Sequence, residues 1–145
     1  MNLFLSRFAI KNGKLGLSRT WVLPVDEPDK SKAPIAAYYT LASSSISRHD
    51  IPIDKNLPGY PVPVVLLARL AVDKNHQGQH LGEKTLITAL RKSVELTDKG
   101  LPVIGLILDV LDENALYFYQ KYEIFKPFTS DPMRLFVSLL VLRQL

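Results

Sequence analysis

The stretch Arg69-Leu-Ala-Val-Asp-Lys-Asn-His-Gln-Gly-Gln-His-Leu-Gly82 decides the fold, because it leads from a strand through a short polar turn into a long helix. The apolar run 62–72, interrupted by Arg69, is typical of a central strand buried on both faces. Residues 81–99 repeat apolar side chains at helical spacing and stop before Gly100, a good C-cap. Such an arrangement points backbone N–H groups and the positive end of a helix dipole at one place, which suits a pyrophosphate.

The two glycines of this stretch, Gly78 and Gly82, have two interpretations. Glycine lets backbone approach a ligand closely, because no Cβ stands in the way. It also allows a tight turn and close packing of a helix without any ligand. On spacing alone, a tight turn without a ligand is the better interpretation. The interpretation as a ligand-binding loop therefore depends on further motifs.

The sequence on either side predicts one α/β domain over residues 1–145, with no repeat, linker or low-complexity tract. Before the central strand we expect a helix over 3–10, which Asn12-Gly13 ends. A hairpin follows, with strands 18–25 and 34–42 around a turn at 27–30, and then a loop over 43–60. After the long helix we expect a second buried strand over 102–111, a helix capped by Asp112-Glu-Asn114 and running to Tyr122, a loop over 126–133 and a last strand over 134–142.

Composition excludes several classes of protein. A hydrophobic fraction of 47% over 145 residues is that of a globular domain with a core, and excludes a disordered chain. No window approaches the ~20 consecutive apolar residues of a membrane span, and we expect no signal peptide. The absence of cysteine excludes disulfides and thiol catalysis and fits a cytoplasmic location. The histidines, His49, His76 and His80, lack metal-ligand spacing, so we expect no metal site.

The net charge of +4 is a mild bias, but the basic residues are unevenly placed. Arg7, Lys11, Lys14 and Arg19 all precede the first acidic residue, Asp26. This cationic segment is either a solvated helix face or a patch that binds a polyanion such as RNA, and the sequence leaves both open.

Three motifs together resemble the GNAT (Gcn5-related) N-acetyltransferase superfamily. Gln77-Gly-Gln-His-Leu-Gly82 resembles its Gln/Arg-x-x-Gly-x-Gly/Ala pyrophosphate loop, Leu70-Ala-Val72 its pantetheine-binding strand, and Ala115-Leu-Tyr-Phe-Tyr119 its Ala-x-x-Phe-Tyr helix. The resemblance implies an acetyl-CoA-binding fold with a central mixed, mostly antiparallel sheet flanked by helices. Because members usually have a strand and most of a helix before the point matching Leu3, we expect a fold that lacks the first strand.

Within that superfamily the chain resembles the toxin branch of toxin–antitoxin systems. The matching segments are Arg19-Thr20, Tyr38-Tyr-Thr-Leu-Ala42, 63–72 and Asp131-Pro-Met133. The resemblance implies acetylation of the α-amino group of aminoacyl-tRNA, which blocks translation, and neutralisation by a ribbon-helix-helix or similar antitoxin; it also allows a homodimer. Two alternatives stay open: an enzyme that acetylates a small amine or a protein N-terminus, and a catalytically weakened acyl-CoA-binding domain.

The resemblance also assigns site residues. Those implied to bind the cofactor are Leu70, Ala71, Val72, Gln77, Gly78, Gln79, His80, Leu81, Gly82, Asp112, Ala115 and Phe118. The backbone N–H of Val72 is implied to bind the thioester carbonyl. Tyr119 is implied to be the general acid, since a phenol with a pKa of ~10 is protonated at neutral pH. On a helix Phe118 and Tyr122 share one face, which we expect to pack, whereas Tyr119 points ~100° away.

Two local departures support the weakened-domain alternative. His80 stands where the family's loop has its central glycine, so its Cβ would crowd the pyrophosphate or its imidazole would contact the phosphates. The usual Gly-Phe pair after Tyr119 is also missing, because the chain continues as Gln120-Lys-Tyr-Glu-Ile-Phe125.

Overall fold

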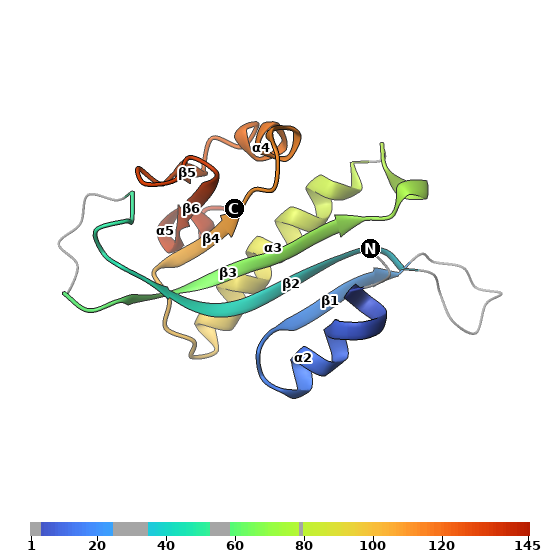
Figure 1. Ribbon diagram of the computed structural model, residues 1–145, viewed down its shortest axis with the longest axis horizontal. Coiled ribbons are helices and arrows are strands. Elements are labelled where there is room, and N and C mark those ends of the chain that lie inside the picture. The colour runs from blue at the N-terminus through green and yellow to red at the C-terminus, as the bar shows by residue number, and fades with distance from the viewer. Residues whose placement is uncertain (1–3, 25–34, 53–58, 79) are drawn as a thin grey trace. The chain divides into compact units, whose positions relative to one another are not determined.

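The computed structural model describes residues 4–24, 35–52, 59–78 and 80–145 (Figure 1). The chain divides into two compact units: the first comprises Met1–Ala42 and Leu67–Ala89, the second Ser43–Leu66 and Leu90–Leu145. A six-stranded sheet has the order β1-β2-β3-β4-β6-β5. Strands β3 and β4 are parallel, while β1/β2, β4/β6 and β5/β6 are antiparallel, so the sheet is mixed, as expected.

The first unit begins with a helix that packs on a hairpin. A π-helical segment η1 (Leu5–Ala9) continues into α2 (Ile10–Lys14), which lies against β1 (Arg19–Pro24) (Figure 1). The predicted hairpin is confirmed, with β1 antiparallel to β2 (Ile35–Ile46). Its pairs include Trp21 stacked on Tyr39 at 5.4 Å between ring centroids. The predicted turn at 27–30 lies outside the described residues.

The predicted helix break at Asn12-Gly13 is wrong, since α2 runs through both residues to Lys14. A glycine inside a helix costs only about 1 kcal/mol, so Gly13 does not end it. Gly16, with φ +76°, ends it instead. The N–H of Gly16 bonds the carbonyl of Gly13, and that of Leu17 bonds the carbonyl of Asn12, which is a Schellman motif.

Strand β3 (Val62–Val72) has the predicted bounds but not the predicted burial. Val62, Val64, Val65 and Leu67 are buried, whereas Ala68 and Arg69 are exposed, so burial on both faces is wrong for the C-terminal half. Its pairing with β4 matches Val65 with Leu106 and Leu66 with Ile107. The six residues Leu67–Val72 continue beyond that ladder in the first unit.

Helix α3 (Leu81–Asp98) confirms the prediction for 81–99 to within one residue. Leu86, Ala89 and Leu90 on its apolar stripe are at most 1% exposed. Gly100, with φ +120°, closes the helix by the same Schellman motif as α2, with the N–H of Leu101 bonded to the carbonyl of Leu96.

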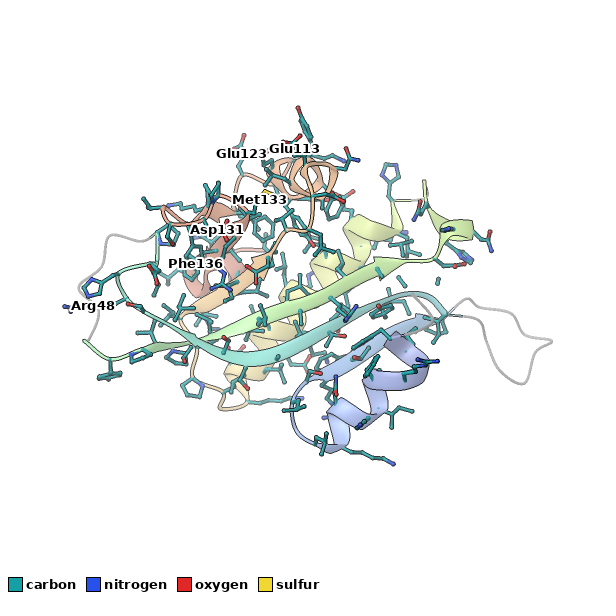
Figure 2. The ribbon with its side chains drawn as sticks, viewed as in Figure 1. Arg48, Glu113, Glu123, Asp131, Met133 and Phe136 are labelled. Atoms are coloured by element: carbon teal, nitrogen blue, oxygen red, sulfur yellow. The ribbon has the colours of Figure 1, made fainter. Side chains whose placement is uncertain are left out.

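In the second unit, β4 (Gly105–Asp109) and β6 (Arg134–Ser138) form the centre, and Leu106, Ile107, Phe136 and Val137 are buried. Gly105 is required by close approach: a Cβ there would lie 2.3 Å from the Val137 carbonyl oxygen and 2.8 Å from the Phe136 ring. In Figure 2, Phe136 is labelled within this unit.

Several predicted bounds in the second unit are wrong. Ser43–Ile46 belongs to β2 and not to the loop over 43–60, with Ile46 buried beside exposed Ser45 in the alternation of a strand. Strand β4 is shorter than 102–111, α4 (Glu113–Gln120) stops before Tyr122, and β5 (Lys126–Pro127) lies in the predicted loop. Leu139–Leu142 forms helix α5, not strand, because the Ser138 hydroxyl caps it by accepting from the N–H of Val141 at 3.3 Å. None of the described helices has the length and apolarity needed to cross a bilayer.

Candidate functional site

The end of β3 and the turn after it form the first set of predicted site residues. Leu70, Ala71 and Val72 are half-buried, and the N–H of Asp73 donates to the carbonyl of Ala36 at 2.7 Å, which keeps this strand end on β2. A short 3-10 turn η2 (Lys74–His76) follows. Gln77 Nε2 then reaches back to the carbonyl of Val72 at 3.5 Å, so the structure brings the predicted pantetheine strand and pyrophosphate loop together.

A side-chain pair in this turn was not predicted. His76 Nδ1 lies 3.2 Å from Asp73 Oδ2, and both side chains are partly buried. The contact closes the 3-10 turn and helps to fix the direction in which the chain leaves β3. The sequence shows the Asp-x-x-His spacing, but only the turn conformation reveals that the two side chains meet.

Backbone conformation explains the glycine at position 78 and exposes strain at position 80. Gly78 has φ +86°, and a Cβ there would meet nothing within 4 Å, so the turn requires glycine for its conformation and not for packing. His80 adopts φ +57°, a left-handed conformation that is unfavourable for a residue with a Cβ. Its side chain is 84% exposed, with Nδ1 4.0 Å from Glu83 Oε2. Gln79, between them, lies outside the described residues.

The N-terminus of α3 supplies backbone donors beside this turn. Helical bonding starts with the N–H of Lys84, which donates to the His80 carbonyl at 3.2 Å. The N–H groups of Leu81, Gly82 and Glu83 precede that bond and have no acceptor within the helix. Together with the dipole of an 18-residue helix, they make this turn suited to an anion.

The second set of predicted residues lies on α4 in the second unit. Asp112 caps the helix, because its Oδ1 accepts from the N–H of Ala115 at 2.8 Å, as the sequence predicts. Phe118 is partly buried and touches Tyr119 edge-on at 5.0 Å between centroids and Tyr122 at 5.8 Å. The structure therefore places Asp112, Ala115, Phe118 and Tyr119 on one element.

Tyr119 is more buried than the sequence indicates. We expected packing on the face of Phe118 and Tyr122, but Tyr119, on the other face, is 9% exposed and is the buried residue of α4. Phe125, from the segment after the helix, covers it edge-on at 5.5 Å. Burial raises the pKa of Tyr119 to about 12, so the phenol holds its proton throughout the neutral range.

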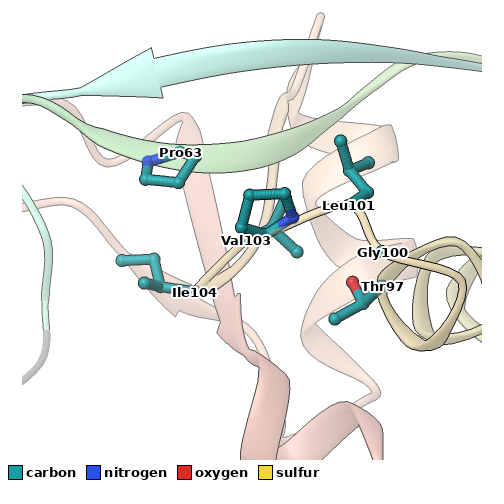
Figure 3. A pocket seen from close by; sticks show the side chains of 7 residues that line it. Pro63, Thr97, Gly100, Leu101, Val103 and Ile104 are labelled. Carbon is teal, nitrogen blue, oxygen red and sulfur yellow. The ribbon is translucent and has the colours of Figure 1, made fainter.

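Two cavities are lined by residues that belong to neither set. One of about 410 Å³ in the second unit is lined by Pro63, Thr97 and the loop Gly100–Ile104 (Figure 3). Its lining carries no titratable side chain, so it offers no acid, base or nucleophile. The other, of about 330 Å³, lies between η1, α2 and β1 in the first unit. Within the described ranges, no three His, Asp or Glu side chains are grouped to hold a metal ion.

Comparison with known proteins places the chain in a family. A tRNA-acetylating toxin from Mycobacterium tuberculosis is 33% identical over 134 residues, which cover 91% of this chain and 75% of the toxin. The chain belongs to the tRNA-acetylating toxins. A probable toxin TacT from Sinorhizobium fredii is 27% identical, covering 98% of the chain and 81% of that protein. No family model matches.

Solved structures of toxins in this family share the fold. A Tyr-to-Phe mutant of KacT superposes with a TM-score of 0.86 at 26% identity, covering 99% of this chain and 84% of that one. AtaT complexed with acetyl-methionyl-tRNAfMet gives 0.85 at 26% identity, with the same coverages. AtaTR bound with acetyl-CoA gives 0.80 at 26% identity, covering 99% and 83%. The GNAT fold and the toxin branch inferred from the motifs are thus confirmed.

Proposed function

We propose that this protein is a toxin that transfers the acetyl group of acetyl-CoA to the α-amino group of aminoacyl-tRNA and so blocks translation. The observation that carries this function is the similarity, over 99% of the chain, to AtaT in complex with acetyl-methionyl-tRNAfMet. The identity to the M. tuberculosis tRNA-acetylating toxin supports the same activity. The proposal treats residues 1–145 as one acetyltransferase domain and, since charged tRNA is cytoplasmic, as a cytoplasmic enzyme.

We place acetyl-CoA on the turn after β3. Its pyrophosphate would accept from the N–H groups of Leu81, Gly82 and Glu83 at the start of α3 and from the loop Gln77–His80. Its pantetheine arm would pair with the backbone of Leu70–Val72, in the part of β3 that its ladder with β4 does not use. Asp112, Ala115 and Phe118 complete the binding residues in this proposal.

The transfer step needs an oxyanion donor and a proton for the leaving thiolate. The substrate amine attacks the thioester carbonyl, and the oxyanion that forms accepts from the N–H of Val72. As the C–S bond breaks, the Tyr119 hydroxyl gives its proton to the sulfur of CoA. The proton released by the amine returns to the phenolate, so no separate base is consumed. A pKa of about 12 favours this return, because the ionised phenol is costly in its buried site.

The proposal includes a protein partner. A toxin that acetylates charged tRNA must be neutralised in the cell that makes it, and we propose an antitoxin of the ribbon-helix-helix type. We also propose a homodimer, which light scattering of the purified protein tests. Co-expression with the product of a short neighbouring reading frame tests the antitoxin, since a neutralising partner restores growth and co-purifies.

One observation favours a second candidate, a catalytically weakened acyl-CoA-binding domain. His80 holds a left-handed backbone where the family's loop has glycine, which places a Cβ in the proposed pyrophosphate site. One experiment distinguishes the toxin from the weakened domain. The protein is mixed with labelled acetyl-CoA and total charged tRNA, and uncharged tRNA and a peptide amine serve as control acceptors. Transfer to charged tRNA alone supports the toxin, whereas calorimetric binding of acetyl-CoA without transfer to any amine supports the weakened domain.

A further inference from the structure

A bidentate ion pair joins the ends of the two central strands of the second unit. Asp109 ends β4 and is the register partner of Arg134, which begins β6. Nε of Arg134 donates to Oδ1 of Asp109 at 2.7 Å, and Nη2 donates to Oδ2 at 3.1 Å. The hydrogen bond with Asp109, helped by the charges of Asp131 and Asp50, raises the pKa of Arg134. This paired geometry fixes direction as well as distance, because both carboxylate oxygens are held.

The turn before Arg134 is tied to the same strand end. The N–H of Val110 donates to the carbonyl of Met133 at 2.8 Å. Asp131 holds the turn in shape, because its Oδ1 accepts from the N–H of Met133 at 2.9 Å and its carbonyl accepts from the N–H of Arg134 at 3.1 Å. Figure 2 labels Asp131 and Met133 in this turn. The chain leaving β4 is therefore held by a side-chain bridge and by backbone.

The end of β4 is connected to Tyr119 in two ways. Along the chain, only Val110 and Leu111 separate Asp109 from Asp112, the residue that caps α4. Through packing, the carbonyl of Arg134 accepts from the N–H of Phe128 at 2.8 Å, and three residues before Phe128 lies Phe125, the ring that covers Tyr119. Arg134 thus contacts Asp109, three residues before the cap of α4, and Phe128, three residues after the ring that covers Tyr119.

We propose that Asp109 and Arg134 are positioning residues, which hold α4 so that the Tyr119 hydroxyl meets the thioester sulfur. This inference rests on the proposed role of Tyr119. A surface ion pair of this exposure contributes little to global stability. A displacement of the acid by about 1 Å, however, lowers transfer on the order of 100-fold. The bridge therefore matters for the rate far more than for the fold.

The chain offers a matched control in the same unit. Arg143 Nη2 lies 2.7 Å from Asp98 Oδ1, with side-chain exposures of 44% and 53%, against 36% and 52% for Arg134 and Asp109. This second bridge joins the end of α3 to the residue after α5, and neither residue belongs to α4 or to the segments that flank it in the chain. We compare Arg134→Gln with Arg143→Gln, and add Asp109→Asn and the Asp109→Asn/Arg134→Gln double variant.

Both Gln variants should lower Tm by a similar small amount, no more than about 4 °C. Arg134→Gln should lower kcat by about 10-fold to 100-fold with the acetyl-CoA Kd unchanged, whereas Arg143→Gln should keep the parental kcat. The double variant should be no slower than Arg134→Gln, because the two residues act as one bridge. Equal kcat for Arg134→Gln and the parent, or losses that multiply in the double variant, overturns the inference.

A second readout separates this inference from the proposed function. Amide hydrogen exchange of α4, Glu113–Gln120, should become faster in Arg134→Gln and not in Arg143→Gln. If the parent transfers no acetyl group but α4 loosens in this way, the bridge does hold α4, and it is the proposed function, with the role of Tyr119 in transfer, that fails. If exchange in α4 is the same in both variants, positioning is wrong whatever the parent catalyses.

Discussion

Replacing Tyr119 by phenylalanine removes one buried hydroxyl and tests both its environment and its role. The ring is 9% exposed, lies against Phe118 and Phe125, and burial raises its pKa from 10.0 to about 12. The native protein therefore keeps this proton in a range of pH where the unfolded chain has lost it. Because the native state binds the extra proton there, stability must fall as pH rises from about 10 to about 12.

The size of this loss follows from the two pKa values. Shifting one group from 10.0 to about 12 corresponds to roughly 1 kcal/mol at pH 11 and roughly 3 kcal/mol well above pH 12. Tyr119→Phe has no phenol to ionise, so its free energy of unfolding should exceed that of the parent by an extra amount of this size at alkaline pH. Urea unfolding of both proteins at pH 8 and pH 11 measures the difference, with pH 8 as the internal control. Parallel stability curves above pH 10 would show that Tyr119 is not desolvated.

The same variant tests the chemistry. Packing should survive, because phenylalanine keeps the ring between Phe118 and Phe125. General acid catalysis contributes about 100-fold to 10,000-fold, so turnover on aminoacyl-tRNA should fall by that order while acetyl-CoA affinity stays nearly constant. Rapid-quench transfer from labelled acetyl-CoA and calorimetry measure the two quantities. Near-parental turnover would mean that water or the substrate protonates the thiolate.

Substitutions at three further positions test the loop and the core. His80→Gly should bind acetyl-CoA several-fold more tightly than the parent, because it removes a Cβ held at φ +57°, whereas His80→Ala should not bind more tightly. Weaker binding by both variants in calorimetry would show that the imidazole contacts the cofactor. Gly82→Asp should weaken acetyl-CoA binding at least about 10-fold, because it places a negative charge among the N–H donors of α3. Gly82→Asn should weaken binding much less. Equal affinities of the two variants in calorimetry would exclude a charge effect. Gly105→Ala should lower the free energy of unfolding by about 3 kcal/mol or more, since its Cβ would meet the Val137 carbonyl at 2.3 Å, and unchanged urea unfolding would show that the strands separate easily.

Elements with local signals at both ends were predictable from the sequence. Strand β3 and helix α3 have nearly the predicted bounds, because the polar turn at Asp73 and the C-cap at Gly100 mark their limits. The apolar run after Arg134 carries no such mark, since Leu139-Leu-Val-Leu142 fits a strand or a buried helical turn equally well. The Ser138 cap decides for the helix. This boundary was wrong because a single side-chain hydrogen bond decides it.

The proposed site residues show the same contrast between contacts that are local in the sequence and contacts that are not. Asp112 as a cap depends on residues three positions apart, and the sequence predicts it. The return of Gln77 to Val72 spans five positions and was not predicted. The Asp109–Arg134 bridge joins residues 25 positions apart and exists only because β4 and β6 pair in one register. The cover of Phe125 on Tyr119 likewise requires the chain to fold back after α4. Contacts set by strand register and by a returning segment leave no trace in a local motif.

His80 shows how far the loop depends on its neighbours. A left-handed residue with a Cβ costs about 1–2 kcal/mol, so this conformation persists only if the flanking structure imposes it. Asp73 is bonded to Ala36 on one side, and α3 starts from the His80 carbonyl on the other. With both ends held, the backbone takes the shape that glycine would take, and the donors of the α3 N-terminus stay in place. In the proposed pyrophosphate site, the exposed imidazole would change the surroundings of the anion and leave its backbone donors in place. The comparison of His80→Gly with His80→Ala therefore separates a Cβ effect from an imidazole contact.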